Sequence, residues 1–557
     1  MNVNNLTPWQ RFMGMLKLDK KDIFQIFYYA IFSGIVALSL PLGIQAIISL
    51  IQGAQISTSW IVLVILVTVG VAFSGALQLM QLRIIEAIQQ RVFTRAAFEL
   101  SFRFPKIKME ELRNYYPPEL ANRFFDTLTI QKGLSKILID VPTALLQIIF
   151  ALILLSFYHA FFILFGILLL LLVYIVFKYT AKRGLETSLI ESKNKYKVAH
   201  WIQEIARTIV SFKMAGNSNI ALQKNDDLVE EYLKSRENHF KVLVLQFIQM
   251  ISFKVVITAG LLTIGGALVL KEEMNIGQFV AAEIIILLVI ASVEKLILGL
   301  ESFYDVLTSI EKLGQIVDKE LEPQMGEKPL FKNNFSIELK DVSLKVSNRA
   351  KPILKDINLT IDSSERVLIK GESGSGKSSL LRMLSAITEP SGEGAIYIND
   401  VSLQSLHLNH YRSQLGLSLS DETPFEGTLK ENITFGTNDI TDEEIFELIE
   451  QVGLTKYVKE LPKGIQTVLQ PDGKQISYTI SKKIILARAI AKKPKMLLLE
   501  DPLDRFNCEE TESIIKYLTD KKHTWTLIVV SSSPMWKNYS DKIITLVEGR
   551  IDSIKKT

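Results

Sequence analysis

Cysteine and histidine are scarce in this chain of 557 residues, which has one cysteine, Cys508, and six histidines. A disulfide framework and a cysteine-rich zinc site are therefore excluded, and little is left for a metal centre built from histidine. The net charge is only +4, and the chain has no long basic block of the kind that binds nucleic acid. We expect no nucleic-acid partner.

Apolar residues are abundant and unevenly distributed. They make up 48% of the chain, and the mean hydropathy is +0.24, which makes a purely soluble protein a poor fit. A helix needs about 20 apolar residues to cross a membrane. Six stretches approach or exceed that length: 23–51, 60–80, 137–158, 161–178, 242–270 and 276–300. The first is too long for a signal peptide and lacks a small-residue cleavage site, so the sequence predicts six permanent membrane-spanning helices.

Lysine and arginine indicate how these helices are oriented. They are frequent in the long connections 81–136 and 179–241, whereas the connections 52–59, 159–160 and 271–275 contain one lysine between them. Since positive residues mark cytoplasmic connections, we expect both long connections and both termini in the cytoplasm. The long connections also have helical periodicity. The sequence therefore predicts an integral membrane protein whose spans continue into two long cytoplasmic hairpins.

Prolines and ionisable residues interrupt the apolar stretches. Pro41 and Pro142 are expected to kink the first and third spans. Four ionisable residues lie within or near apolar runs: Lys254, Glu283, Glu294 and Lys295. Such groups are candidates for substrate contact, Glu283 above all. The alternative is structural, because a lysine can pair with a neighbouring carboxylate or extend its charge toward the membrane surface.

The second half of the chain has a different composition. From residue 335 onward, short β-branched runs alternate with turns and amphipathic helices, which is typical of an α/β domain. The predicted architecture is multidomain: an all-α six-helix transmembrane domain followed by an α/β domain with a phosphate-binding loop. The predicted boundaries are an N-terminal cytoplasmic segment (1–20), the transmembrane domain (21–315), a linker (316–334) and the α/β domain (335–557).

The second domain contains a predicted phosphate-binding loop at residues 371–379. A strand at 367–370 leads into Gly-Glu-Ser-Gly-Ser-Gly-Lys-Ser-Ser and then into a helix, the context that the motif GxxxxGK[ST] requires. Glycines let backbone N–H groups approach phosphates, the lysine supplies charge, and Ser378 supplies a Mg²⁺ ligand. The predicted ATP-binding residues are Gly371, Glu372, Ser373, Gly374, Ser375, Gly376, Lys377, Ser378 and Ser379. The alternative is a chance glycine- and serine-rich turn.

Two carboxylates follow a second apolar strand. The segment 495–501 reads Lys-Met-Leu-Leu-Leu-Glu-Asp, so Glu500 and Asp501 come directly after the strand. We expect Glu500 to face the metal, together with Ser378, and Asp501 to act as the catalytic base for an attacking water. The alternative is a pair that caps the next helix.

The chain resembles a half-transporter of the ATP-binding cassette (ABC) exporter superfamily over nearly its whole length. In the second half, the resemblance lies in the phosphate loop and in the segments 352–361, 426–436, 461–467, 485–490 and 548–551. In the membrane half, 40–47 and 97–105 resemble the branch that exports peptides or proteins, often with a periplasmic adaptor. The resemblance implies a bacterial inner-membrane protein that contacts membrane lipids and forms a homodimer or a heterodimer with another ABC half-transporter.

Several motifs depart from the family pattern. The family's signature helix begins Leu-Ser-Gly-Gly-Gln, whereas residues 476–480 read Ile-Ser-Tyr-Thr-Ile. A tyrosine at position 478 would obstruct the approach to the γ-phosphate bound by the partner, while Ser477 and the helix N-terminus remain. Three single positions also differ: Val346 replaces the aromatic that stacks on adenine, Ser420 the metal-sensing glutamine, and Ser532 the switch histidine.

The acidic residues also differ from the family pattern. Together, these differences leave two functions open. The usual order Asp-Glu is reversed to Glu500-Asp501, and 504–507 read Asp-Arg-Phe-Asn in place of Ser-Ala-Leu-Asp. The resemblance implies an ABC-type ATPase that exports a peptide, lipid or other amphipathic substrate, with weak or impaired hydrolysis. The alternative is a catalytically degenerate nucleotide-binding subunit that regulates or scaffolds a partner.

Overall fold

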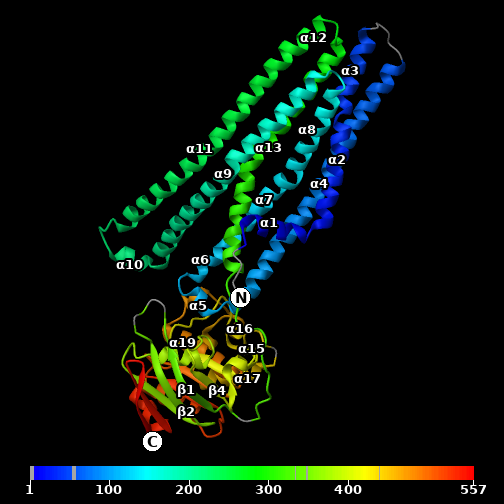
Figure 1. Ribbon diagram of the computed structural model, residues 1–557. Coiled ribbons are helices and arrows are strands. Elements are labelled where there is room, and N and C mark those ends of the chain that lie inside the picture. Colours follow the sequence, from blue (N-terminus) through cyan, green and yellow to red (C-terminus); the bar gives the residue numbers. More distant parts are fainter. Residues whose placement is uncertain (1–5, 53–57, 333, 347–348, 350, 438) are drawn as a thin grey trace. The chain divides into compact units, whose positions relative to one another are not determined.

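The computed structural model describes residues 6–52, 58–332, 334–346, 349, 351–437 and 439–557. The chain divides into two compact units: Met1–Pro105 with Asn114–Lys319, and Lys106–Arg113 with Glu320–Thr557. The predicted N-terminal segment and the first outer connection fall in part, at 1–5 and 53–57, outside the described residues. The first unit is helical and the second contains the sheets (Figure 1).

The prediction of six spanning helices is confirmed for the described residues. The helices are α1 (Pro8–Lys17), α2 (Lys20–Ala37), α3 (Ser39–Gln52), α4 (Thr58–Arg103), α5 (Met109–Leu112), α6 (Pro117–Asn122), α7 (Asp126–Ser135), α8 (Val141–Ser156), α9 (Phe161–Arg207), α10 (Ile209–Met214), α11 (Ile220–Gly260), α12 (Gly266–Leu270) and α13 (Ile276–Val317). Of these, α5 belongs to the second unit. Exposed side chains on the spans are largely apolar, as in Ile61, Leu66 and Leu164, which suits a lipid environment.

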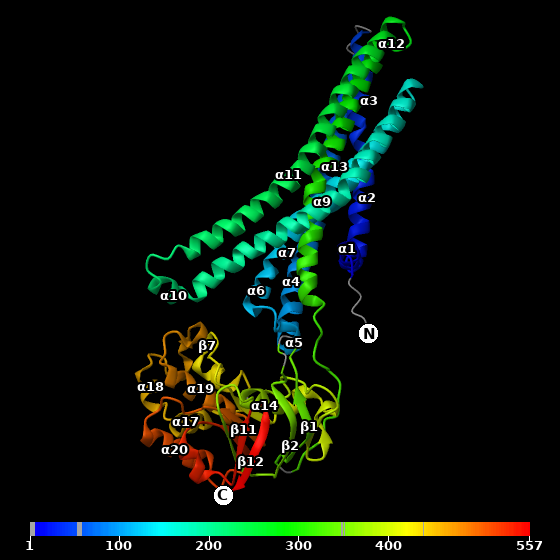
Figure 2. The ribbon, with the colours of Figure 1, turned by 60° about the vertical axis from the view of Figure 1, so that its left-hand side comes forward.

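The helices continue well beyond the apolar stretches, as the periodicity predicted. α9 has 47 residues and α11 has 41, and the two lie side by side as a long hairpin closed by α10 (Figures 1 and 2). Both prolines mark irregular backbone. The first span breaks between α2 and α3, just before Pro41, and Pro142 lies in the first turn of α8, directly after a π-helical turn over Lys136–Asp140.

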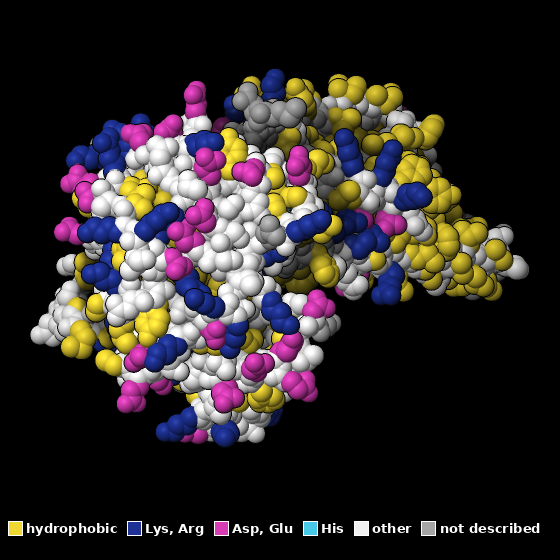
Figure 3. All heavy atoms as spheres, turned by 90° about the horizontal axis from the view of Figure 1, so that it is seen from below, with side chains coloured by type: hydrophobic (Ala, Val, Ile, Leu, Met, Phe, Trp, Pro, Cys, Tyr) yellow, Lys and Arg dark blue, Asp and Glu magenta, His cyan; other side chains and the backbone are white. Residues whose placement is uncertain are grey.

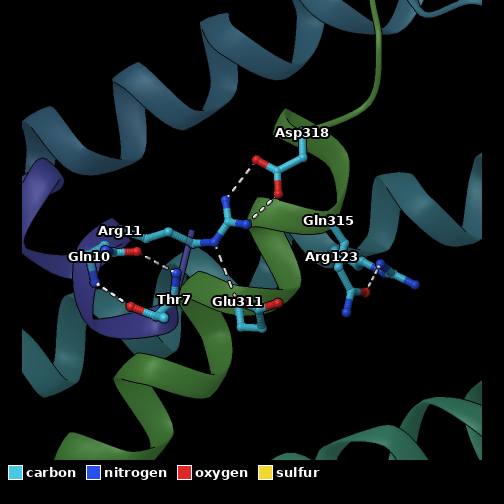
Figure 4. Close-up of polar contacts among 7 residues, drawn as sticks. All are labelled: Thr7, Gln10, Arg11, Arg123, Glu311, Gln315 and Asp318. Atoms are coloured by element: carbon cyan, nitrogen blue, oxygen red, sulfur yellow. Dashed lines mark hydrogen bonds and ion pairs between the residues drawn. The ribbon is translucent and has the colours of Figure 1, made fainter. Parts of the chain in front are cut away.

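The short helix α1 is clamped to the end of α13. Phe12 is 2% exposed, and Arg11 extends its guanidinium between two carboxylates of α13 and its cap. Its Nε lies 3.3 Å from Glu311 Oε2, and its Nη1 lies 2.8 Å from Asp318 Oδ1 (Figure 4). Gly314 leaves room for this contact, because a Cβ there would lie 2.6 Å from Arg11 Cζ.

Replacement of Arg11 should loosen α1 from α13. We expect Arg11→Ala to lower the stability of the first unit by about 1.5–3 kcal/mol, because two partly buried carboxylates lose a charged partner. Thermal unfolding of the purified protein measures this. Lys17→Ala, which removes an exposed charge from the same helix, is the matched control. Equal unfolding temperatures for Arg11→Ala and Lys17→Ala would contradict the expectation.

The second unit is built on three sheets. Their strands are β1 (Ile337–Leu344), β2 (Leu354–Ile361), β3 (Arg366–Gly371), β4 (Ala395–Ile398), β5 (Val401–Ser402), β6 (Leu415–Ser418), β7 (Gly427–Thr428), β8 (Val468–Leu469), β9 (Met496–Glu500), β10 (Thr526–Val530), β11 (Lys542–Val547) and β12 (Arg550–Lys556). The strand orders are β2-β1-β4-β5, β12-β11-β3-β10-β9-β6 and β7-β8. Every residue of β9 and β10 is buried, as expected for central strands of a parallel sheet.

Besides α5, seven further helices accompany these sheets in the described part of the chain. They are α14 (Lys377–Leu384), α15 (Leu408–Arg412), α16 (Leu429–Thr434), α17 (Asp442–Gln451), α18 (Thr455–Glu460), α19 (Tyr478–Ala491) and α20 (Cys508–Leu518). Basic and acidic side chains are interspersed over the face of this unit that Figure 3 presents. The α/β character predicted for this half of the chain is confirmed.

The segment Lys106–Arg113 is part of the second unit although it lies between two helices of the first. Its backbone pairs with the start of the chain that follows α13. The N–H of Lys108 donates to the carbonyl of Glu320 at 3.0 Å, and the N–H of Glu322 donates to the carbonyl of Lys106 at 2.7 Å. These two hydrogen bonds are strand-like, and Ile107 and Leu321 form an antiparallel bridge.

Candidate nucleotide site

The predicted site residues meet at one edge of the six-stranded sheet. β3, β10, β9 and β6 are parallel neighbours, so their carboxyl ends lie at the same edge. The phosphate loop follows β3, Glu500 ends β9, and Asp501 follows it. Ser531 and Ser532 come after β10, and Ser420 comes after β6. Residues far apart in the sequence are thereby brought together at the position where this class of sheet binds ligands.

Two glycines allow the phosphate loop to fold tightly. Gly376 has φ +99°, and a Cβ there would lie 2.6 Å from Leu354 Cδ2. A Cβ on Gly371 would lie 2.3 Å from the carbonyl oxygen of Leu546. Only glycine fits at either position without displacement. The loop ends at Gly376, and α14 begins at Lys377, so the N-terminus of this helix faces the loop.

Lys377 lies over the loop that precedes it. Its Nζ donates to the carbonyl of Gly371 at 2.8 Å and to that of Glu372 at 2.7 Å, with Ser375 Oγ at 3.4 Å. These contacts hold the ammonium group at the loop, where a phosphate group requires positive charge. The backbone of residues 371–376 thus forms a continuous loop, and the ammonium group of Lys377 lies against it.

The two residues expected to hold Mg²⁺ are in direct contact. The hydroxyl of Ser378 donates to Glu500 Oε1, and the other carboxylate oxygen of Glu500 accepts the N–H of Ser420 at 3.1 Å. Glu500 is 5% exposed. Hydroxyl and carboxylate oxygens are ligands that Mg²⁺ prefers, so this pair of side chains fits the ion that the motif implies.

Asp501 lies beside Glu500 and is half-buried. Burial raises the pKa of its carboxyl above the ordinary value, hydrogen bonds from the Ser532 N–H and from Ser531 oppose the rise, and the charge of Glu500 adds to it. A raised pKa makes a carboxylate a stronger base, which suits the predicted role. Ser532 therefore contacts Asp501 through its backbone N–H.

Lys482 also belongs to this edge, and the sequence reasoning missed it. It is 2% exposed, and its Nζ donates to the carbonyls of Leu419 at 3.0 Å and Ser420 at 2.6 Å. Burial lowers the pKa of Lys482, and nearby carboxylates, Glu500 and Asp501 among them, oppose that change. The available signal was weak, because Lys482 is one of three basic residues in α19, with Lys483 and Arg488.

Tyr478, in the segment compared with the family's signature helix, has two cationic side chains near its ring. Ser477 caps α19 by accepting the N–H of Ile480 at 3.3 Å, as its place at the helix N-terminus predicts. The guanidinium of Arg505 lies 4.9 Å from the ring centre of Tyr478, and the Nζ of Lys482 lies 5.5 Å from it. Both distances are within the range of cation–π attraction. Arg505 was another residue that sequence reasoning did not single out.

Fold and site together define a membrane protein that carries an ATP-binding cassette. The family model described as "ABC transporter transmembrane region" matches residues 23–293, and the model described as "ABC transporter" matches residues 354–504. The chain belongs to the ABC transporter family, and the cassette is an ATP-binding domain. Six candidate membrane-spanning helices within the described residues and the transmembrane-region match make it an integral membrane protein, as the resemblance implied.

Individual relatives agree with this assignment. The chain is 31% identical over 296 residues to the ATP-dependent permease MDL1 of Candida albicans, covering 51% of this chain and 42% of that protein. It is 28% identical over 317 residues to the exotoxin translocation ATP-binding protein PaxB of Pasteurella aerogenes, covering 56% and 44%. The match thus spans less than half the length of both relatives.

The fold agrees with a solved exporter. The structure of a bacterial Atm1-family ABC exporter with ATP bound superposes with a TM-score of 0.83 at 16% identity, covering 96% of this chain and 95% of that one. At this identity the similarity concerns the fold. It confirms the predicted architecture of a helical transmembrane domain followed by an α/β nucleotide-binding domain.

The raised pKa of Asp501 predicts how this residue affects stability. A carboxyl whose pKa is higher in the folded state binds protons more readily there, so its contribution to stability falls as pH rises through that pKa. Asp501→Asn should therefore raise the unfolding temperature at pH 7–8 by about 2–4 °C, which corresponds to about 1 kcal/mol. The gain should shrink toward pH 4. Glu443→Gln, at an exposed acid of α17, is the control, and an equal gain in both variants contradicts the prediction.

Proposed function

We propose that this chain is half of a dimeric exporter that uses ATP to move a peptide, lipid or other amphipathic substrate across a membrane. The observation that supports it most is the meeting of Lys377, Ser378, Glu500 and Asp501 at one sheet edge in a chain with six spanning helices. Hydrolysis of ATP would supply the free energy, and Ser378 and Glu500 would hold a Mg²⁺ ion that offsets the charge of the phosphates.

The roles of the site residues follow from their surroundings. The phosphate loop and Lys377 would bind phosphates, and Ser378 and Glu500 would hold Mg²⁺. Asp501 would accept the proton of the attacking water, since its raised pKa favours a basic carboxylate. We place both long hairpins and both termini in the cytoplasm, on the distribution of lysine and arginine.

The family also suggests the assembly. ABC exporters work as dimers of half-transporters, so we propose a homodimer, or a heterodimer with another ABC half-transporter, in a bacterial inner membrane. One relative, PaxB, is named for exotoxin translocation, which favours a peptide or protein branch and a periplasmic adaptor as a further partner. Membrane lipids would contact the exposed apolar faces of the spans.

Tyr478, where the family's signature helix has a glycine, favours a second function. Tyr478 begins α19 and makes a cation–π contact with Arg505, which lies between β9 and α20, and the glycine that allows close approach in the family is absent. Hydrolysis would then be slow. A nucleotide-binding subunit that regulates or scaffolds a partner is the alternative that this arrangement supports.

Nucleotide measurements on the protein in lipid nanodiscs test the proposal. We expect wild type to bind ATP and Lys377→Ala to bind it about 10–100-fold more weakly, because a charged hydrogen-bond donor to phosphate is lost. Asp501→Asn should bind ATP normally and lose hydrolysis. Lys463→Ala, an exposed lysine outside the loop, is the control. ATP binding without any turnover favours the regulatory alternative, whereas turnover at about 1 per second or more contradicts impaired hydrolysis.

The pH profile of hydrolysis tests the role of Lys482. Asp501 and Lys482 attract each other electrostatically, so Lys482→Met should move the acid limb of the profile to higher pH. Lys482→Arg, which keeps the charge, should move it less. The matched control is Lys474→Met, at an exposed lysine. An acid limb at the same pH in Lys482→Met and wild type would refute this electrostatic role.

A further inference from the structure

The helix α14 connects the phosphate loop to a second set of contacts at its other end. Its first turn carries Lys377 and Ser378, which donate to the loop carbonyls and to Glu500. At the other end, the hydroxyl of the buried Tyr411 donates to the carbonyl of Leu384 at 2.6 Å. The helix has eight residues and is about 12 Å long. Because a packed helix of this length is stiff, constraint of its first turn also constrains its last.

Arg412 holds the end of α14 and the chain that follows α13 at the same time. Its Nε donates to the carbonyl of Ser385 at 3.3 Å, and its Nη2 donates to that of Ala386. Its Nη1 and Nη2 also lie 2.6 and 2.9 Å from the two carboxylate oxygens of Glu322. The side chain of Glu322 is 10% exposed. A cation at a helix C-terminus and a bidentate carboxylate pair are both favourable, so one guanidinium joins the two segments firmly.

The backbone at the end of α14 depends on this contact. Ala386 has φ +57°, a left-handed conformation in which glycine is the usual residue after a helix. Another residue stays in that conformation only where its surroundings hold it. The hydrogen bond from Arg412 to the Ala386 carbonyl is one such constraint. Loss of Arg412 should therefore free the end of α14 as well as break an ion pair.

Glu322 also belongs to a paired structure, which we call the ribbon: the segments Lys106–Arg113 and Glu320–Glu322. Two backbone hydrogen bonds and an antiparallel bridge join these segments. The Nζ of Lys108 lies 2.7 Å from Glu320 Oε1 and 3.8 Å from Oε1 of Glu389, a residue of the segment after α14. Both segments and α14 belong to the second unit. The ribbon is thus fastened at the end of α14 that is opposite the phosphate loop.

We propose that Arg412 is a positioning residue that couples ATP at the phosphate loop to the ribbon. Phosphate oxygens would become partners of Lys377 and thereby fix the first turn of α14. The fixed helix holds its last carbonyls, and the guanidinium of Arg412 then holds Glu322. Order at one site lowers the entropy cost of order at the other, and such coupling is reciprocal. ATP therefore stabilises the ribbon, and an intact ribbon strengthens ATP binding. This inference requires ATP binding by the cassette and is independent of export.

Hydrogen–deuterium exchange tests the inference on the full-length protein in phosphatidylcholine nanodiscs, with and without saturating ATP and Mg²⁺. The readouts are the backbone amides of Lys108 and Glu322 in the ribbon, and those of residues 371–379 as a report of ATP binding. In wild type, we expect ATP to slow exchange of both ribbon amides about fivefold. Arg412→Met should abolish this effect in the ribbon while ATP still protects the loop. By reciprocity, the same variant should bind ATP about fivefold more weakly.

Arg382→Met is the matched control, because Arg382 lies on α14 but pairs with Asp421, which is outside the ribbon. It should retain the full effect of ATP on the ribbon amides. Arg412→Lys, which keeps the charge without the bidentate geometry, should retain part of the effect. Glu322→Gln should lose as much as Arg412→Met, and the double variant should lose no more than either single one.

Three results would overturn the inference. ATP could protect the loop of wild type and leave the ribbon amides unchanged, it could protect neither, or Arg382→Met could remove the effect as fully as Arg412→Met. ATP hydrolysis is measured separately on the same preparations. An effect of ATP on the ribbon without any hydrolysis would contradict the proposed ATP-driven exporter and leave the coupling intact, whereas hydrolysis without an effect of ATP on the ribbon would do the reverse.

Discussion

The buried carboxylate of Glu500 connects the parts of the cassette that the nucleotide requires. One oxygen accepts the hydroxyl of Ser378 from the phosphate loop, and the other accepts the N–H of Ser420 from the segment after β6. Lys482 donates to the carbonyls of that same segment, so α19 is joined to the arrangement as well. Because β3, β9 and β6 all end at this edge, one buried charge joins the segments that follow these three strands.

Glu500, Asp501 and Ser532, which differ from the family pattern, all contact one another or their neighbours at this edge of the sheet. Reversing the acidic pair places the longer glutamate against Ser378 and leaves the shorter Asp501 next to the serines that follow β10. Ser532 offers a backbone N–H to Asp501 but no imidazole that could change its charge near neutral pH. In the proposed assignment, the site keeps the residues that would bind phosphate and metal and differs at the positions where the resemblance implies groups that respond to the nucleotide.

The sequence predicted features whose signals are local. Six apolar stretches indicate six spans, and the glycines and lysine of 371–377 report a loop whose shape depends on adjacent residues. Lys482 and Arg505 could not be found this way, since their roles depend on carbonyls and a ring brought to them by folding.

The assignment of Lys106–Arg113 to the second unit has a mechanical consequence. The chain passes between the units three times, after Pro105, after Arg113 and after Lys319, instead of once through a single tether. Backbone hydrogen bonds from this segment to Glu320 and Glu322 join two of those crossings inside the second unit. The two segments that follow α4 and α13 are therefore held to each other within the second unit, so the chain leaves the ends of these two helices into one hydrogen-bonded ribbon.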